Sequence, residues 1–151
     1  MAYKSLIGES MTKHPYIANR KMTVKEAGLF MEGCRIRHLP VIENSKIVGI
    51  VSDRDLQKAG SFRGPGELLV EDVMTRQPYC VKKGANIAGV VRAMAHERIG
   101  SAIVLDEQDQ IIGIFTTTDG MLLLSEILEK GPQSQEHREL PWESFPEYMS
   151  W

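Results

Sequence analysis

The sequence lacks any long hydrophobic run, and this absence argues against a membrane protein. No apolar stretch in its 151 residues approaches the roughly 18 to 20 residues that span a bilayer. The opening MAYKSLIGESMTKHP also lacks the apolar core of a secretory signal. We therefore expect a cytoplasmic protein with no membrane partner.

An excess of basic charge is also missing. The chain has 18 lysines and arginines against 20 aspartates and glutamates, which gives a formal net charge of −2. A protein that mainly neutralises nucleic-acid phosphates normally shows a clear basic excess. The composition, 42% hydrophobic and 25% charged, is that of an ordinary globular domain. We expect no nucleic-acid partner.

Cysteine is scarce, which makes a disulfide framework or a structural zinc site improbable. Cys34 and Cys80 are the two cysteines, they form no C-x-x-C pair, and no histidine pair lies nearby at zinc-site spacing. We expect both to be reduced thiols that pack as small hydrophobic side chains. No metal site is predicted.

What the sequence does contain is a repeat. GIVSDRD at 49–55 and GIFTTTD at 113–119 share a glycine, two apolar residues, a hydroxyl residue and a final aspartate. MTKHPY at 11–16 and MTRQPY at 74–79 share four of six positions. An offset of 63 residues aligns the first parts of the copies, and one inserted residue changes it to 64. The chain is therefore a tandem duplication.

The repeat divides the chain into a module and a tail. A segment with three glycines and a proline separates the two copies and is a linker by composition. The predicted boundaries are a module over 1–129, made of repeat one at 7–57, a linker at 58–69 and repeat two at 70–129, followed by a tail at 130–151.

Each copy predicts the same order of elements. An extended run follows a proline, then a helix is indicated by the spacing of Val24, Ala27 and Met31 in copy one. Two apolar strands joined by a polar turn come next and read as a hairpin. A second helix begins after Ser52 or Thr116. The fold class is α+β (mixed α/β), with two β-α-β-β-α repeats packed as a pseudo-twofold module.

The hydroxyl and acid of the repeated phrase admit two interpretations. Ser52 with Asp55, and Thr116 with Asp119, form the pattern of a capping box, which would account for both pairs by itself. However, both helix starts lie at the same place in the fold, where free N–H groups suit an anion. A carboxylate one turn into the helix can also accept hydrogen bonds from the two hydroxyls of a ribose. Capping and ligand binding can coexist.

The combined motifs resemble a tandem pair of cystathionine β-synthase (CBS) domains, the arrangement called a Bateman module. The resemblance covers about residues 7–129 and is carried by VMT and SMT, TVKEA, IRHLPVIE, KIVGIVSDRDL, RIGSAIVLD and IIGIFTTTD. It implies a non-catalytic regulatory module, homodimeric, that signals to a separate effector protein. The implied regulatory ligands are AMP, ADP or ATP, ahead of NAD(H) and S-adenosylmethionine, and no cofactor is required.

The resemblance also implies two clefts between the repeats, each with an aspartate on the ribose. The first cleft would use Ile50, Ser52, Arg54 and Asp55, with Tyr79, Cys80 and Ile99 along the adenine. The second would use Ile114, Thr116, Thr118 and Asp119, with Tyr16, Ile17, Ile36 and His38. Copy one alone carries Arg37, His38 and Arg54, so the Asp55 cleft is the better anion site if these side chains make the phosphate contacts. The alternative for Arg54 is a solvated charge in the first turn of its helix.

An enzyme and a ligand-free scaffold are the two alternative functions. An enzyme would need a nucleophile or phosphate motif, but the sequence has neither a G-x-S-x-G elbow nor a Walker-type phosphate loop. We therefore predict no catalytic residues. The alternative to a sensor is a dimerisation scaffold with empty clefts, which the presence of both aspartates argues against.

Two C-terminal features point to further contacts. The helix near 116–130 has four consecutive apolar residues, so it should bury two faces, one of them against a partner subunit. The tail places Trp142, Phe145, Tyr148 and Trp151 at every third position. We expect these rings to dock on the module or its dimer mate, and a disordered or partner-binding tail is the alternative.

Overall fold

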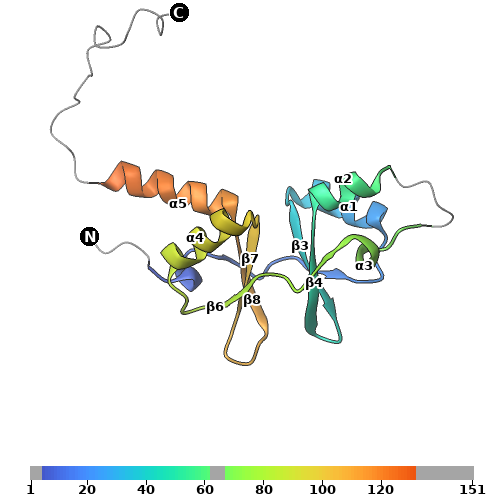
Figure 1. Ribbon diagram of the computed structural model, residues 1–151, viewed down its shortest axis with the longest axis horizontal. Helices are drawn as coiled ribbons and strands as arrows, with labels where there is room; N and C mark the ends of the chain where they lie inside the picture. Colours follow the sequence, from blue (N-terminus) through green and yellow to red (C-terminus); the bar gives the residue numbers. More distant parts are fainter. Residues whose placement is uncertain (1–4, 62–66, 132–151) are drawn as a thin grey trace, which may run out of the picture.

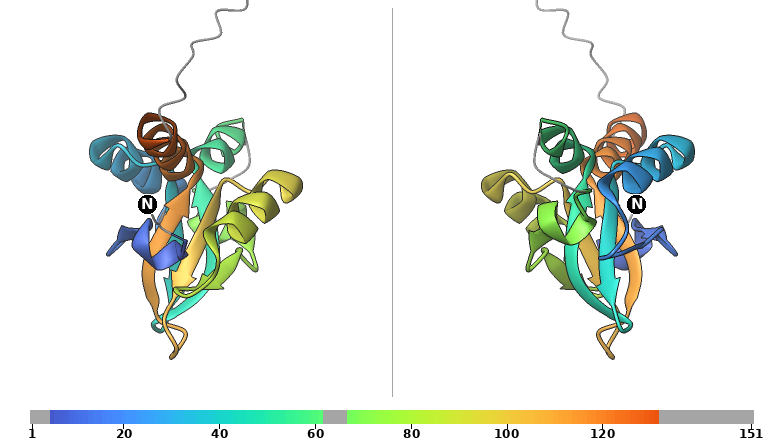
Figure 2. Two further views of the ribbon diagram at one scale, coloured as in Figure 1. Left: turned by 90° about the vertical axis from the view of Figure 1, so that its left-hand side faces the viewer. Right: turned by 90° about the vertical axis from the view of Figure 1, so that its right-hand side faces the viewer.

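The computed structural model of the protein describes residues 5–61 and 67–131, in two halves that lie side by side (Figure 1). Each half has a four-stranded sheet, in the strand orders β2-β3-β4-β5 and β1-β8-β7-β6. The helices α1, α2, α4 and α5 gather at one end of the molecule and the hairpin turns at the other (Figures 1 and 2). The predicted docking of the aromatic tail, and residues 62–66 of the linker, lie outside the described residues.

The element order predicted for each copy is confirmed, and so is the mixed α and β class. Copy one forms β2 (Ala18–Asn19), α1 (Val24–Cys34), β3 (His38–Glu43), β4 (Lys46–Ser52) and α2 (Asp53–Ala59). Copy two forms β6 (Cys80–Lys82), α4 (Ile87–Glu97), β7 (Ser101–Leu105), β8 (Ile111–Thr116) and α5 (Thr117–Lys130).

Two short segments that precede these units pack in the opposite half. The 3₁₀ helix η1 (Ile7–Glu9) and strand β1 (Thr12–Lys13) come first in the chain, yet β1 pairs antiparallel with β8 of copy two. Likewise α3 (Val70–Val73) leads into β5 (Thr75–Arg76), which pairs with β4 of copy one. The units that pack together are therefore not the same as the units that repeat in the sequence.

We call these two segments, η1–β1 and α3–β5, the exchanged segments. Hydrogen bonds and buried side chains hold each of them in place. The backbone N–H of Ile7 donates to the carbonyl of Ala85 at 2.9 Å, and that of Val70 donates to Met22 at 2.8 Å. Ile7 and Val70 are both fully buried, each within the core of the opposite half. Burying such a side chain contributes about 1.5–3 kcal/mol, so the exchange ties the two halves into one folding unit.

The two long central helices begin and end in matching ways. Thr23 caps α1 by accepting from the N–H of Glu26 at 3.1 Å, and Asn86 caps α4 in the same manner. Both helices end at an arginine in the left-handed region, Arg35 at φ 54° and Arg98 at φ 55°. Such a residue reverses the chain sharply, which sends β3 and β7 back towards the space between the halves.

The helix α5 leaves an apolar face uncovered within the chain. Met121, Leu122 and Leu128 are 66%, 61% and 73% exposed, and no residue of α5 is fully buried. One of the two faces that the sequence predicts to be buried is therefore open in the single chain. No helix in the described part of the chain combines the length and hydropathy that crossing a bilayer requires.

In each copy, the glycine of the repeated motif, Gly49 or Gly113, packs against a methionine of an exchanged segment. A Cβ added at Gly49 would lie 2.6 Å from Sδ of Met74, and one added at Gly113 would overlap Sδ of Met11. Both distances are too short for a real Cβ, so only glycine lets the methionine approach the strand. The repeated glycine and the repeated Met-Thr pair are thus two sides of one contact.

We predict that Gly49→Ala lowers the free energy of unfolding by about 1–3 kcal/mol, because the added methyl group forces Met74 out of its site. Urea unfolding followed by circular dichroism measures the change. Gly33→Ala is the matched control, since a Cβ there meets nothing within 4 Å. It should be neutral or stabilising by up to about 1 kcal/mol, as expected for alanine replacing glycine in a helix. Equal effects of the two substitutions would contradict the packing argument.

Candidate functional site

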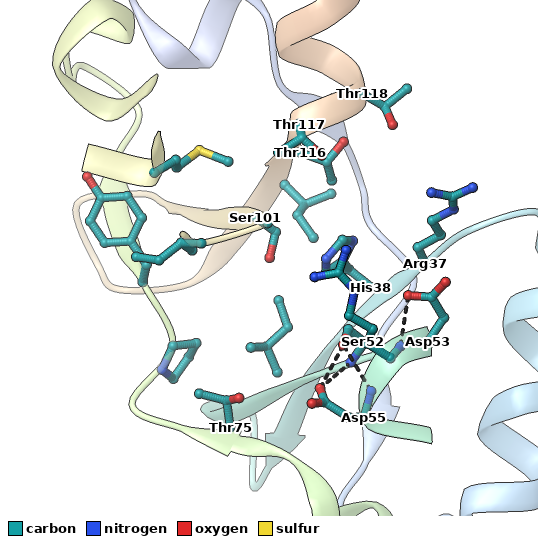
Figure 3. A pocket seen from close by; sticks show the side chains of 18 of the residues that line it. Arg37, His38, Ser52, Asp53, Asp55, Thr75, Ser101, Thr116, Thr117 and Thr118 are labelled. Carbon is teal, nitrogen blue, oxygen red and sulfur yellow. Dashed lines mark hydrogen bonds between the residues drawn. The ribbon is translucent and has the colours of Figure 1, made fainter. Parts of the chain in front are cut away.

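A cleft of about 1390 Å³ lies between the two halves, and matching segments of both copies line it (Figure 3). The sheets bring these segments together because their registers repeat: His38 pairs with Ser52 in one sheet, and Ser101 pairs with Thr116 in the other. The cleft is therefore lined by the start of β3 and β7, the end of β4 and β8, and the first turn of α2 and α5.

The capping boxes predicted at both second helices are present. Oδ2 of Asp55 accepts from the backbone N–H and the hydroxyl of Ser52, both at 2.8 Å. Oδ2 of Asp119 accepts from the N–H and the hydroxyl of Thr116 at 2.7 and 3.0 Å. One oxygen of each carboxylate is thus fixed by the cap, which also fixes the direction of the other oxygen.

The second carboxylate oxygens differ between the copies. Oδ1 of Asp119 accepts a long hydrogen bond of 3.4 Å from the hydroxyl of Thr12, on the exchanged strand β1. The matching residue on β5 is Thr75, which lines the cleft near Asp55 but makes no such bond (Figure 3). Among the described residues, Oδ1 of Asp55 has no hydrogen-bond donor, so it is the freer acceptor.

Tyr79, Cys80 and Ile99 form an apolar part of the wall, together with Ile50 and Ile114. Burial raises the pKa of the Cys80 thiol, and the nearby charge of Asp109 adds to the effect. The thiol therefore stays protonated at neutral pH and presents a weakly polar surface. Such a wall suits the flat face of an aromatic ring system.

His38 reaches from the first half across to the second. A Cβ added at Gly100 would lie 2.9 Å from its Nε2, so the ring packs against the backbone at that glycine. Desolvation lowers the pKa of His38; the charges of Asp53 and Asp55 oppose the shift, and those of Arg37 and Arg54 add to it. The neutral ring is therefore the form that the fold favours.

Nearly all residues predicted to bind a ligand line this one cleft. They are Ile36, Arg37, His38, Ile50, Ser52, Arg54, Asp55, Tyr79, Cys80, Ile99, Ile114, Thr116, Thr118 and Asp119. Tyr16 and Ile17 do not line it; Tyr16 instead packs edge-on against Phe30, with ring centroids 5.4 Å apart.

Several lining residues were absent from the prediction. Thr12 and Thr75 enter the cleft only because of the segment exchange, although their repetition after methionine in both copies was a visible signal. The other additional residues with polar or charged side chains are Arg35, Asp53, Lys58, Gln77, Arg98, Ser101 and Thr117. Within the described residues, no three His, Cys, Asp or Glu side chains group closely enough to hold a metal ion.

Comparison with protein families finds one family that matches the chain twice. The model of the CBS domain matches residues 5–61 and again residues 70–126. A homoserine O-acetyltransferase of Methanocorpusculum labreanum is 29% identical over 126 residues, which is 82% of this chain but 24% of that protein. The chain spans between 22% and 39% of the length of the first three curated relatives it matches.

Two solved structures are similar over nearly their whole length. A Vibrio cholerae protein named AcuB superposes with a TM-score of 0.73 at 30% identity, covering 85% of this chain and 95% of that one. The CBS domain pair of protein MJ0100, in complex with 5′-methylthioadenosine and S-adenosyl-L-methionine, gives 0.74 at 25% identity, covering 81% and 97%. These neighbours confirm the predicted arrangement as a pair of repeats.

We predict that His38 makes stability depend on pH. Because its pKa is lower in the folded chain than the ordinary 6.5, the unfolded chain takes up the proton first as pH falls. The free energy of unfolding should therefore decrease from about pH 7.5 downward until the folded ring is also protonated. Urea unfolding between pH 8 and pH 5 measures this decrease.

The variant His38→Gln should show a shallower decrease than the unmodified protein over the same range. His96→Gln, at an exposed position on α4, is the control for losing a histidine elsewhere. Identical pH profiles for the unmodified protein and His38→Gln would contradict the assignment of this proton to His38.

Proposed function

This chain belongs to the CBS domain family, and on that premise we propose that it is a non-catalytic regulatory module that binds an adenosine-containing ligand between its repeats. AMP, ADP and ATP are the ligands we favour, ahead of NAD(H) and S-adenosylmethionine. The signal passes to a separate effector protein. No cofactor is required for this role.

The observation that carries the proposal is the position of Asp55 and Asp119 in one cleft. Each uses one oxygen for its helix cap, and both aspartates line the cleft between the halves. A ribose offers two neighbouring hydroxyls that can donate to such a carboxylate. The hydroxyl-and-acid pairs therefore serve the fold and the ligand together.

The apolar wall supports adenine as the ring that accompanies the ribose. Tyr79, Cys80 and Ile99 belong to copy two and line the same cleft as Asp55. The MJ0100 pair is in complex with two ligands that both contain adenosine, and it is the same fold at 25% identity. We assign these three residues to adenine and Ile50 to the ribose side.

Binding would act on the whole module because the cleft has one wall in each half. A ligand that contacts both walls shifts their relative position only by its difference in affinity for the two arrangements. The exchanged segments link each half to the other through β1 and β5, so a change at the cleft reaches both sheets. The effector would read this change at the module surface.

We also propose that the module is a homodimer. Met121, Leu122 and Leu128 on α5 and Leu29 on α1 are exposed apolar residues, and these two helices lie at the helical end of the molecule (Figure 2). An exposed apolar face of this kind is costly in water and is typical of an interface. The same observation favours the second candidate function, a scaffold that dimerises without a ligand.

Calorimetric titration with AMP, ADP, ATP, NADH and S-adenosylmethionine tests the sensor. We expect saturable binding, which Asp55→Asn should weaken by about 10- to 100-fold, the loss of one or two charge-assisted hydrogen bonds. Asp119→Asn should also weaken it, though less, because Thr12 already contacts that carboxylate.

Asp72→Asn is the matched control for these variants. Asp72 accepts from the N–H of Leu69 at 2.8 Å as the third residue of a helix cap, but it lies outside the cleft. Its variant should bind like the unmodified protein. Absence of heat and of any thermal shift with every ligand at millimolar concentration would favour the scaffold instead.

Light scattering after size-exclusion chromatography tests the homodimer. Leu122→Lys introduces the side chain that copy one has at the matching position, Lys58, and should convert the dimer to a monomer with an unchanged circular dichroism spectrum. Gln110→Lys, in the hairpin turn at the opposite end, is the control and should stay dimeric. A monomeric unmodified protein at micromolar concentration would overturn the proposal.

A further inference from the structure

The two walls of the cleft differ in charge although their backbones match. Arg35 and Arg98 occupy equivalent positions and both line the cleft, so they contribute equally to the two sides. Beyond this balanced pair, three cations line the first-repeat wall and have uncharged counterparts in copy two. They are Arg37 opposite Gly100, Arg54 opposite Thr118, and Lys58 opposite Leu122.

Acidic side chains offset this excess only in part. Asp55 and Asp119 balance each other, and the one extra acid is Asp53, whose counterpart is Thr117. Oδ1 of Asp53 accepts from the backbone N–H of Arg54 at 2.9 Å, and no guanidinium of the described residues forms an ion pair with it. The described residues include no salt bridge to Arg37, Arg54 or Lys58.

We infer that the cleft selects a nucleoside polyphosphate and that Arg37, Arg54 and Lys58 hold its phosphate chain. The inference rests on the proposed function, since it needs the ribose to lie on Asp55. Arg54 is the residue before Asp55, and the backbone N–H of Asp53 donates to the carbonyl of Arg37 at 2.9 Å. A ribose on Asp55 would therefore lie on the same wall of the cleft as these cations.

The chemistry of the three side chains suits several phosphates rather than one. All three are exposed at the rim, so they remain hydrated without a ligand and can each turn towards a different phosphate. Guanidinium groups bind phosphate oxygens in pairs, and the lysine adds a point charge one turn further along α2. The same wall repels a positively charged sulfonium, so it disfavours S-adenosylmethionine.

The carboxylate oxygen of Asp55 that has no hydrogen-bond donor in the described part of the chain also favours the first-repeat wall as the ligand side of the cleft. Oδ1 of Asp55 has no donor among the described residues, whereas that of Asp119 accepts from Thr12. The apolar residues Tyr79 and Cys80 also line the cleft, while their counterparts Tyr16 and Ile17 do not. The free acid and the cations of copy one thus line the same cleft as the apolar residues of copy two.

The test is a calorimetric series with adenosine, AMP, ADP and ATP, in EDTA so that no metal ion bridges the phosphates. We expect affinity to rise with each phosphate, and Arg54→Thr to weaken ATP by about tenfold with adenosine unchanged, the loss of one charge-assisted contact. Arg92→Gln, which removes an exposed cation of α4 outside the cleft, should leave the whole series unchanged.

A double variant separates the position of the charge from its amount. Arg54→Thr with Thr118→Arg keeps the net charge but moves the cation to the other wall, and it should bind ATP no better than Arg54→Thr alone. Recovery of the original series by the double variant would overturn the assignment to the first-repeat wall. Equal affinity for adenosine and ATP would overturn the inference but leave the proposed function standing. If no member of the series binds, and NADH and S-adenosylmethionine do not bind either, both are wrong.

Discussion

The packing of a methionine from each exchanged segment onto a glycine of the opposite sheet is the contact on which the rest of the structure depends. Met11 covers Gly113 and Met74 covers Gly49, so each sheet is completed by chain from the other copy. The same segments carry Thr12 and Thr75 into the cleft. Because the contact that joins the halves lies next to the aspartates, the spacing of the cleft and the integrity of the fold are physically coupled.

The near symmetry of the molecule makes its differences informative. Backbone hydrogen bonds, helix caps and sheet register repeat almost position for position in the two copies. Duplication alone would give two equivalent half-sites. Because the backbones of the two copies match, the differences between the half-sites come from side chains that differ between the copies. Those differences gather on one wall as cations and on α5 as exposed leucines. In the proposed function, the cations of copy one would recognise the charge of the ligand and the leucines of copy two would form the subunit contact.

The capping boxes were predictable from the sequence because they are local. Ser52 and Asp55 are three residues apart, and the hydrogen bonds between them need only one helical turn to form. The same holds for Thr116 and Asp119. Thr12 could not be placed in this way, because it reaches Asp119 across 107 residues of chain. A contact of that kind depends on which sheet edge β1 joins, and the pattern of strand residues is equally compatible with either edge.

The sequence by itself determined the duplication, the element order and the helix caps, since these follow from short spacings that occur twice. About half of the residues that line the cleft were also named beforehand, as what the resemblance to CBS domains implies. Only the tertiary structure decided the exchange of β1 and β5 between the sheets, the contact of His38 with Gly100, and the turning of Tyr16 onto Phe30. The physical reason is that each of these depends on free space left by side chains distant in the sequence. Periodicity specifies which face of an element is buried, but not which neighbour covers it.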